Sequence, residues 1–355
     1  MEELRRAAIR RACQVLFCAA ALAGGAGVAW VSRPAPAAAV GQFPLPMPDA
    51  DAFPALDPAQ RAPAPVVLAD DPDPVVEDPD PEPTSTFADT LAEGMVITGA
   101  TDQRLILFTF DDGPDPRNTP QLLDTLDELG IRAVFFLSTY RLEGEGPWPE
   151  QNRALAREIA RRGHIVANHT HQHEQLPLLE TEEVMRQVEH ADEILERVLG
   201  SRAWLVRPPG GSRSPRVDRL LASRGYTQLL WNVGTGDFQV RDADSVVHTF
   251  TRVLGRRERE FGERGGVVLL HDTHAWSVEA VPRIVGWLRE QNCDLLASGD
   301  ELYDIVGDPR PFFTPRTDDP SAAAPPAHLD DATLERHQAR LREETRRRCE
   351  RVASR

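Results

Sequence analysis

The chain has 355 residues, a formal net charge of −16, and forty basic residues that are all Arg. This acidic balance argues against a nucleic-acid-binding protein, because such proteins normally carry a basic surface. The four Cys are too few and too scattered to predict a disulfide framework, although Cys293 and Cys349 could pair.

An export segment is predicted at residues 1–40. A basic stretch, MEELRRAAIRRA, is followed by an apolar run from Cys13 to Val31 and by the small residues APAAAVG. This order is typical of a secretory signal peptide, but the run is also long enough to remain as an N-terminal membrane anchor. Either form places the rest of the protein in the periplasm, in the cell envelope or outside the cell.

Residues 41–90 are predicted to form a disordered linker. The stretch is rich in Pro, Asp and Ala, as in ADDPDPVVEDPDPEP, and cannot bury enough apolar surface to offset the entropy of ordering it. Repeated Pro and like charges favour an extended spacer.

Residues 91–310 are predicted to form one folded domain. Amphipathic helical segments, such as residues 119–129, 152–162 and 181–199, separate most of its short apolar runs. Continuous apolar strands alternating with helices indicate a parallel sheet covered on both faces. About seven such repeats predict an α/β fold of the barrel type. The runs are RLILFTF, RAVFFL, HIVANH, AWLVRPP, YTQLLWNVG, GGVVLLHD and CDLLAS.

The tail, residues 311–355, is charged and helix-prone. Leu334 and Leu341 are one heptad apart, but Arg348 follows at the next heptad position, so a coiled coil is poorly supported. A solvated helix or a disordered segment is predicted, with a helix that binds a partner as the alternative.

Polar residues end several of the predicted strands. In α/β barrels the loops after the strands converge on one face, so we expect these side chains to meet there and form a site. The residues are Asp111, Asp112, His169, Arg207, His271 and Asp272.

The stretch NHTHQHEQL contains three His. In a helix His169 and His173 would share a face and His171 would point away, whereas in an extended strand all three would align. Two imidazoles and a carboxylate are a common hydrolytic metal site, and Zn²⁺ suits it. One carboxylate of the pair Asp111 and Asp112 could then bind the metal while the other acts as a base.

Five short motifs occur in order along this domain: TFDDGP (109–114), HTHQH (169–173), RPPGG (207–211), DF (237–238) and LLH (269–271). They resemble the motifs of the polysaccharide deacetylase family, also called the NodB-homology domain or carbohydrate esterase family 4. The similarity covers about residues 105–297 and implies a distorted (β/α) barrel with metal-dependent deacetylase activity.

The resemblance also implies roles for single residues. Asp112, His169 and His173 would hold the metal, Asp111 would be the base that deprotonates the attacking water, and His271 would be the acid that protonates the leaving amine. Amide hydrolysis needs these parts, because an amide is a poor electrophile with a poor leaving group.

Supporting roles follow from the same resemblance. Arg207 would pair with Asp111, Asp237 would orient and charge His271, and Leu269 would line the pocket for the acetyl methyl group.

The sequence departs from the family pattern in the substrate groove, which Pro209, Gly210, Trp231 and Phe238 are expected to line with Leu269. Gly210 stands where the family has an aromatic residue. In the fourth motif, Gly234 and Phe238 replace an acid and a tryptophan. His171 and His274 have no role that the family suggests.

The function expected from these residues is removal of N-acetyl groups from an acetylated polysaccharide that contains N-acetylglucosamine, such as peptidoglycan or a chitin-like polymer. The alternatives are an O-acetyl esterase acting on xylan or an exopolysaccharide, a non-catalytic glycan-binding module, and a cyclic-amide hydrolase. Because the predicted ligands, base and acid are all present, the non-catalytic alternative is disfavoured. The sequence carries no signal for an oligomeric state.

Overall fold

The computed structural model describes residues 96–313 and 329–353 of the chain. The predicted export segment and linker, residues 1–40 and 41–90, lie outside the described residues. Among the helices within the described ranges, none has both the length and the apolar character needed to cross a membrane.

Within these ranges ten strands form one sheet, in which every pairing except that of β2 is parallel. The order along the sheet is β1-β7-β6-β5-β4-β3-β9-β2, with β10 beside β3 and β8 beside β9. The strands are β1 (Val96–Ile97), β2 (Ala100–Thr101), β3 (Leu105–Asp111), β4 (Val134–Leu137), β5 (Ile165–Asn168), β6 (Leu205–Val206), β7 (Thr227–Leu229), β8 (Val233–Gly234), β9 (Gly265–His271) and β10 (Asp304–Val306).

The segment from β1 to β2 bridges the two edges of this sheet. β1 pairs with β7 at one edge, and β2 pairs with β9 at the other. The carbonyl of Ile97 accepts a hydrogen bond from Leu230 N at 2.8 Å, and that of Gly99 accepts one from Val267 N at 3.3 Å. The predicted α/β barrel is confirmed, and it is distorted because several of its strands are only two residues long.

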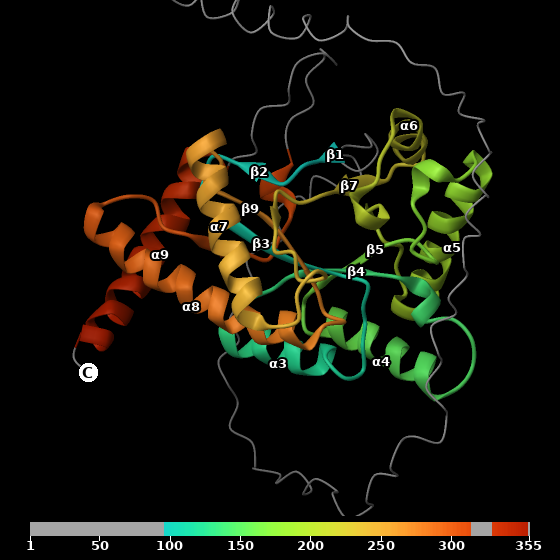
Figure 1. The fold of residues 1–355 in the computed structure, drawn as a ribbon, viewed down its shortest axis with the longest axis horizontal. Coiled ribbons are helices and arrows are strands. Elements are labelled where there is room, and N and C mark those ends of the chain that lie inside the picture. The colour runs from blue at the N-terminus through green and yellow to red at the C-terminus, as the bar shows by residue number, and fades with distance from the viewer. Residues whose placement is uncertain (1–95, 314–328, 354–355) are drawn as a thin grey trace, which may run out of the picture. The chain divides into compact units, whose positions relative to one another are not determined.

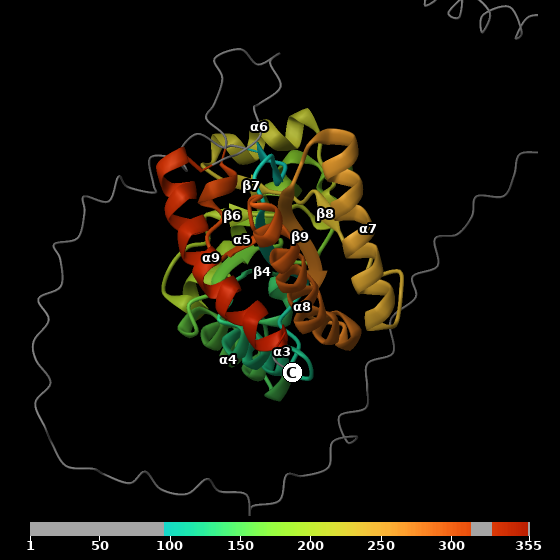
Figure 2. The same ribbon diagram turned by 90° about the vertical axis from the view of Figure 1, so that its left-hand side faces the viewer.

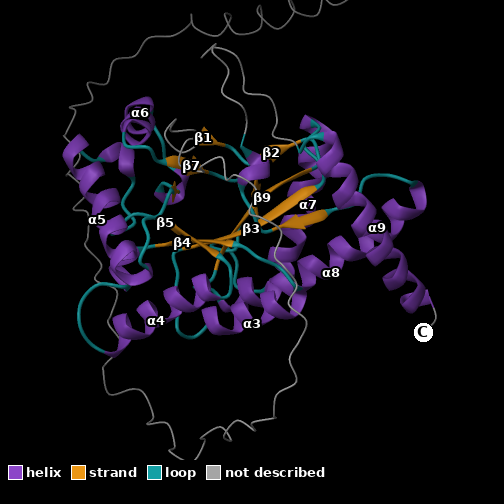
Figure 3. Ribbon diagram, turned by 180° about the vertical axis from the view of Figure 1, so that it is seen from behind, coloured by secondary structure: helices purple, strands orange, loops and turns teal. Residues whose placement is uncertain are grey.

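Helices surround the strands, as Figure 3 shows by colour. α3 and α4 lie along one side of the strands, α5 and α6 along a second, and α7 and α8 along a third (Figure 1). α3 and α5 have the predicted bounds, while α4 begins five residues earlier than predicted, at Pro147. The longer helices are α3 (Thr119–Leu129), α4 (Pro147–Arg161), α5 (Thr181–Leu199), α6 (Pro215–Ser223), α7 (Ala243–Phe261), α8 (Ala275–Ser298) and α9 (Asp331–Ala353).

The apolar residues of the strands divide into two clusters, as the two-residue period of a strand requires. In β3, Leu105 and Leu107 belong to a cluster made mostly of strand residues, which fills the barrel interior. Phe108 and Phe110 belong to a cluster that includes residues of the surrounding helices. Asp111 continues the first series, so the backbone directs its side chain toward the interior.

The prediction of a seventh strand at CDLLAS is wrong. Residues 293–298 form the last turns of α8, which ends where Gly299 adopts a left-handed conformation with φ of 78°. A short apolar run cannot be assigned to strand or buried helix from periodicity alone. The strand that follows α8 is instead β10, whose residues pair with Leu105–Leu107 of β3.

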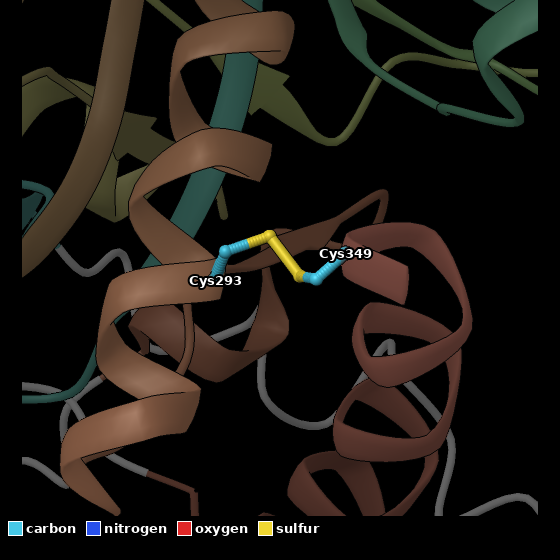
Figure 4. Close-up of a disulfide and its surroundings, with 2 residues drawn as sticks. All are labelled: Cys293 and Cys349. Atoms are coloured by element: carbon cyan, nitrogen blue, oxygen red, sulfur yellow. A yellow bond between two sulfur atoms is a disulfide. The ribbon is translucent and has the colours of Figure 1, made fainter. Parts of the chain in front are cut away.

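Within the described part of the charged tail, residues 331–353 form a helix, α9, which is one of the two predicted forms. This helix packs beside α8 and β10 (Figure 2). The side chain of Gln338 accepts a hydrogen bond from Leu302 N at 2.8 Å and donates one to Leu302 O at 2.9 Å. A disulfide joins Cys293 of α8 to Cys349 of α9 (Figure 4). The helix is therefore less solvated than its composition indicates.

The disulfide is expected to anchor α9. It closes a loop with a sequence separation of 56, so Cys349→Ser should lower the free energy of unfolding by about 4 kcal/mol in the loop-entropy model. Urea denaturation with and without a reductant measures this loss. The reductant should destabilise the wild-type protein and leave the variant unchanged, and an equal response of both proteins would contradict a formed disulfide.

Candidate active site

Of the residues predicted at the strand ends, all but Asp272 gather at one end of the barrel, and those that continue the interior series of their strands face its interior. Asp111 of β3 and His271 of β9 are register partners in neighbouring strands. His169 and Arg207 each come two positions after a strand residue of the interior cluster. The strand alternation that builds the apolar interior therefore also directs these polar side chains into it.

Arg207 is fully buried and holds Asp111. Its Nη1 donates to Asp111 Oδ1 at 2.7 Å and to Thr109 Oγ1 at 2.8 Å, while its Nε donates to Leu229 O at 2.7 Å. These partners satisfy a charge that would otherwise be costly to bury. Asp111 Oδ2 lies 3.6 Å from His169 Nε2, so one carboxylate oxygen holds the arginine while the other faces the imidazole.

Asp112, His169 and His173 come together beside this pair. Asp112 Oδ1 lies 3.4 Å from His169 Nε2 and 3.1 Å from His173 Nε2. The segment from His169 to His173 is neither helix nor strand, and Thr170 and His173 have φ values of 68° and 58°. An irregular loop therefore brings the two imidazoles to one carboxylate. The segment adopts neither the helix nor the extended strand that was considered from the sequence.

This group has the donor set and the electrostatics of a cation site. His169 Nδ1 lies 2.7 Å from Arg207 O, which requires the proton on Nδ1 and directs the Nε2 lone pair toward Asp112. Asp112 Oδ1 is buried and has no hydrogen-bond partner within the described part of the chain. A lone pair facing a carboxylate oxygen is repulsive unless a cation lies between them.

Burial opposes ionisation of Asp112, but the interactions with the neighbouring His169 and His173 imidazoles hold its pKa well below the usual range. The interaction with Asp112 in turn raises the pKa of His173. Asp112 is thus a carboxylate, the form that binds a metal.

His271 and Asp237 form a second polar pair across the site. His271 Nδ1 lies 2.9 Å from Asp237 Oδ1, and the His271 backbone N donates to Asp237 Oδ2 at 2.7 Å. Burial opposes protonation of His271, but its hydrogen bond and charge interaction with Asp237 raise the pKa of the imidazole to about 9. Nε2 lies 4.0 Å from Asp112 Oδ2, so a protonated imidazole can donate a proton next to the metal-ligand group.

Two residues that the sequence analysis missed support Asp237. Ser277 Oγ donates to Asp237 Oδ2 at 2.6 Å, and Trp276 Nε1 donates to the Asp237 carbonyl at 2.7 Å. Both lie in the first turn of α8. Their position directly after the strand that ends in His271 is the signal that could have identified them.

The residues predicted to line the substrate groove lie at different depths: Leu269 and Pro209 are buried, Trp231 is half-buried, and Gly210 and Phe238 are exposed. Phe238 leaves 60% of its surface exposed, and its ring centroid lies 6.0 Å from that of His271. Gly210 has open space where a side chain would project. An exposed apolar ring therefore lies next to the predicted acid.

Asp272 lies directly behind the site, packed against Gly113. A Cβ atom at Gly113 would lie 2.2 Å from Asp272 Oδ1, so a side chain at this position of the TFDDGP motif would have to displace the buried Asp272 carboxylate. Asp272 Oδ2 accepts a hydrogen bond from Thr119 Oγ1 at 2.5 Å, whereas Oδ1 has no partner among the described residues. Complete burial raises the pKa of Asp272 to about 7.

The raised pKa of Asp272 predicts a pH-dependent stability. Because the folded state binds this proton more tightly than the unfolded state, stability should fall as pH rises from about 4 to about 7 and then level off. Asp272→Asn should remove this decline, which is on the order of 3 kcal/mol. Urea denaturation of the wild-type protein and of Asp272→Asn, both treated with a chelator, from pH 4.5 to 7.5 tests this prediction. Every other titrating group is present in both proteins, so the difference between their pH curves reports the contribution of Asp272. Parallel pH curves would contradict the prediction.

Comparisons with known proteins point to one family. Residues 98–229 match the family model described as polysaccharide deacetylase. The chain is 30% identical to a peptidoglycan-N-acetylmuramic acid deacetylase of Bacillus subtilis over 195 residues, which is 55% of this chain and 38% of that protein. It is also 30% identical to a peptidoglycan-N-acetylglucosamine deacetylase of Bacillus cereus over 196 residues, 54% of this chain and 66% of that protein. The chain thus spans less than two thirds of the length of each relative.

A solved structure has a similar fold. The chitin deacetylase of the fungal pathogen Colletotrichum lindemuthianum superposes with a TM-score of 0.50 and 26% sequence identity, covering 60% of this chain and 90% of that one. The family-model match includes Asp111, Asp112, His169, His173 and Arg207 but ends before Asp237 and His271.

Proposed function

This chain belongs to the polysaccharide deacetylase family, and we propose that it is an exported, metal-dependent hydrolase that removes N-acetyl groups from a polysaccharide containing N-acetylglucosamine. The observation that carries the proposal is the convergence of three units on one end of the barrel. These are the Asp112–His169–His173 group, the Asp111–Arg207 pair and the His271–Asp237 pair.

Asp112, His169 and His173 would hold a divalent cation, for which we propose Zn²⁺, and the bound ion would polarise the amide carbonyl and water. The nitrogen and oxygen donors of this group suit Zn²⁺.

The proton transfers are assigned to the chain's own residues. Asp111 would take a proton from the attacking water through Oδ2, because Arg207 occupies Oδ1. His271 would give its Nε2 proton to the amine as the carbon–nitrogen bond breaks, while Asp237 keeps the opposite nitrogen protonated. The products are acetate and the free amino sugar, with the proton count balanced between Asp111 and His271.

Peptidoglycan is the substrate that we propose first. The two curated relatives are named for peptidoglycan, and the apolar N-terminal run indicates export to the compartment where that polymer lies. The exposed ring of Phe238 and the open position at Gly210 would form the groove wall next to His271, and Leu269 would contact the acetyl methyl group.

The test is acetate release by the whole chain, since α9 and its disulfide are part of the folded domain. Peptidoglycan, N-acetylglucosamine oligomers and acetylated xylan would be assayed in parallel, after chelation and after addition of Zn²⁺. We expect release from the amide substrates that stops on chelation and returns with Zn²⁺. Release from xylan alone would establish the esterase instead, and no release from any substrate by the zinc-loaded protein would favour a non-catalytic module.

A further inference from the structure

A second cluster of metal-binding side chains lies apart from the active-site group. It consists of Glu143, which follows the short helix η1 (Thr139–Arg141), His171 from the loop after β5, and His190 from α5. Glu143 Oε1 lies 2.9 Å from His190 Nε2, and Glu143 Oε2 lies 3.3 Å from His171 Nε2. Three segments that are distant in the sequence thus direct one carboxylate and two imidazoles at a common point.

The other nitrogen of His171 has a hydrogen-bonding partner, and that of His190 has an acidic side chain nearby. His171 Nδ1 lies 3.1 Å from Thr139 Oγ1, and His190 Nδ1 lies 3.6 Å from Glu193 Oε2. When Nδ1 carries the proton and faces an oxygen, Nε2 presents its lone pair, which is the arrangement of histidine ligands supported by a carboxylate or hydroxyl group. His190 Nε2 is within hydrogen-bond distance of Glu143 Oε1, so a cation would take the place of the proton shared between these two atoms.

The backbone fixes this arrangement. His171 N donates to Gln187 O of α5 at 2.9 Å, and Tyr140 N of η1 donates to His171 O at 3.0 Å. The His171 side chain is nearly buried, at 10% exposed, whereas those of His190 and Glu143 are 34% and 45% exposed. One ligand is therefore rigid, and the open side leaves room for water as a further ligand.

We propose that Glu143, His171 and His190 bind a second divalent transition-metal ion, with Zn²⁺ as the best match to two imidazoles and one carboxylate. This ion ties η1 and α5 to the loop that carries the active-site ligands, because His171 lies between His169 and His173. The site is independent of the proposed catalysis, since none of its three ligands belongs to the Asp112 group.

Metal content and thermal unfolding of the untagged whole chain test the proposal. Chelator-treated protein would be titrated with ZnCl₂ by calorimetry, and bound zinc would be counted by mass spectrometry after desalting. We expect two Zn²⁺ per wild-type chain, one in His190→Ala, one in Asp112→Ala and none in the double variant. His248→Ala, which replaces an exposed histidine of α7, should keep two.

Unfolding experiments separate binding from damage to the fold. Zn²⁺ should raise the melting temperature of Asp112→Ala through the second site and leave that of Asp112→Ala/His190→Ala unchanged. Glu143→Gln, which keeps the side-chain shape, should weaken zinc binding at the second site at least tenfold. Two zinc ions in His190→Ala, or none in a folded Asp112→Ala, would overturn the proposal. An inactive protein that still binds two ions would overturn only the proposed function.

Discussion

Asp111→Asn is expected to lower turnover on the order of 10³-fold while the metal content stays at the wild-type value. The substitution keeps an oxygen for Arg207 but removes the carboxylate that would deprotonate water. Asp112→Ala, at the adjacent position, should lose turnover and also one equivalent of metal. Acetate release and zinc content, measured on the same preparations, distinguish the two outcomes.

Stability provides the control for this comparison. Arg207 is fully buried, so loss of its charged partner should destabilise Asp111→Asn by a few kcal/mol, and its fold must be verified by circular dichroism. A folded Asp111→Asn with wild-type turnover would refute the assignment of Asp111 as the base. A folded Asp112→Ala that keeps its full metal content would refute the ligand assignment.

Asp237→Asn is expected to lower turnover 10²- to 10⁴-fold without loss of metal. Asp237 Oδ2 accepts hydrogen bonds from the His271 backbone N and from Ser277 Oγ, so the asparagine oxygen must occupy that position. The amide NH₂ then faces His271 Nδ1 and disfavours the protonated imidazole. The pKa of His271 falls, because the hydrogen bond and charge that raise it are lost.

The pH profile identifies this mechanism. Since the acid must be protonated, the alkaline limb of kcat/KM should move to lower pH in Asp237→Asn. Ser277→Ala removes a hydrogen bond to Asp237 but keeps the carboxylate charge, so it is the matched control: turnover should fall less, and the alkaline limb should not move to lower pH. An unchanged alkaline limb in Asp237→Asn would show that His271 is not the acid.

Part of the site could be predicted because local sequence encodes it. The apolar runs that end in Asp111, His169 and His271 lie next to these residues in the chain, and strand alternation sets the direction of each side chain. The same local rules failed for CDLLAS, because a short apolar run fits both a strand and a buried helix turn.

The pairings could not be derived from local pattern. Asp111 and Arg207 are 96 residues apart, and His271 and Asp237 are 34 apart. Loop closure over such distances depends on how the strands assemble, which no local signal reports. The family resemblance suggested these two pairs. It did not suggest that residues of α8 hydrogen-bond to Asp237 or that α9 packs against the domain.

The sequence by itself determined the class of fold and the polar residues at the strand ends, because hydrophobic periodicity acts over a few residues. Only the tertiary structure decided which nitrogen of each histidine faces a carboxylate and that Glu143, His171 and His190 meet. The physical reason is that side-chain direction follows from local backbone geometry, whereas a contact exists only after the barrel closes and brings separate loops to one end.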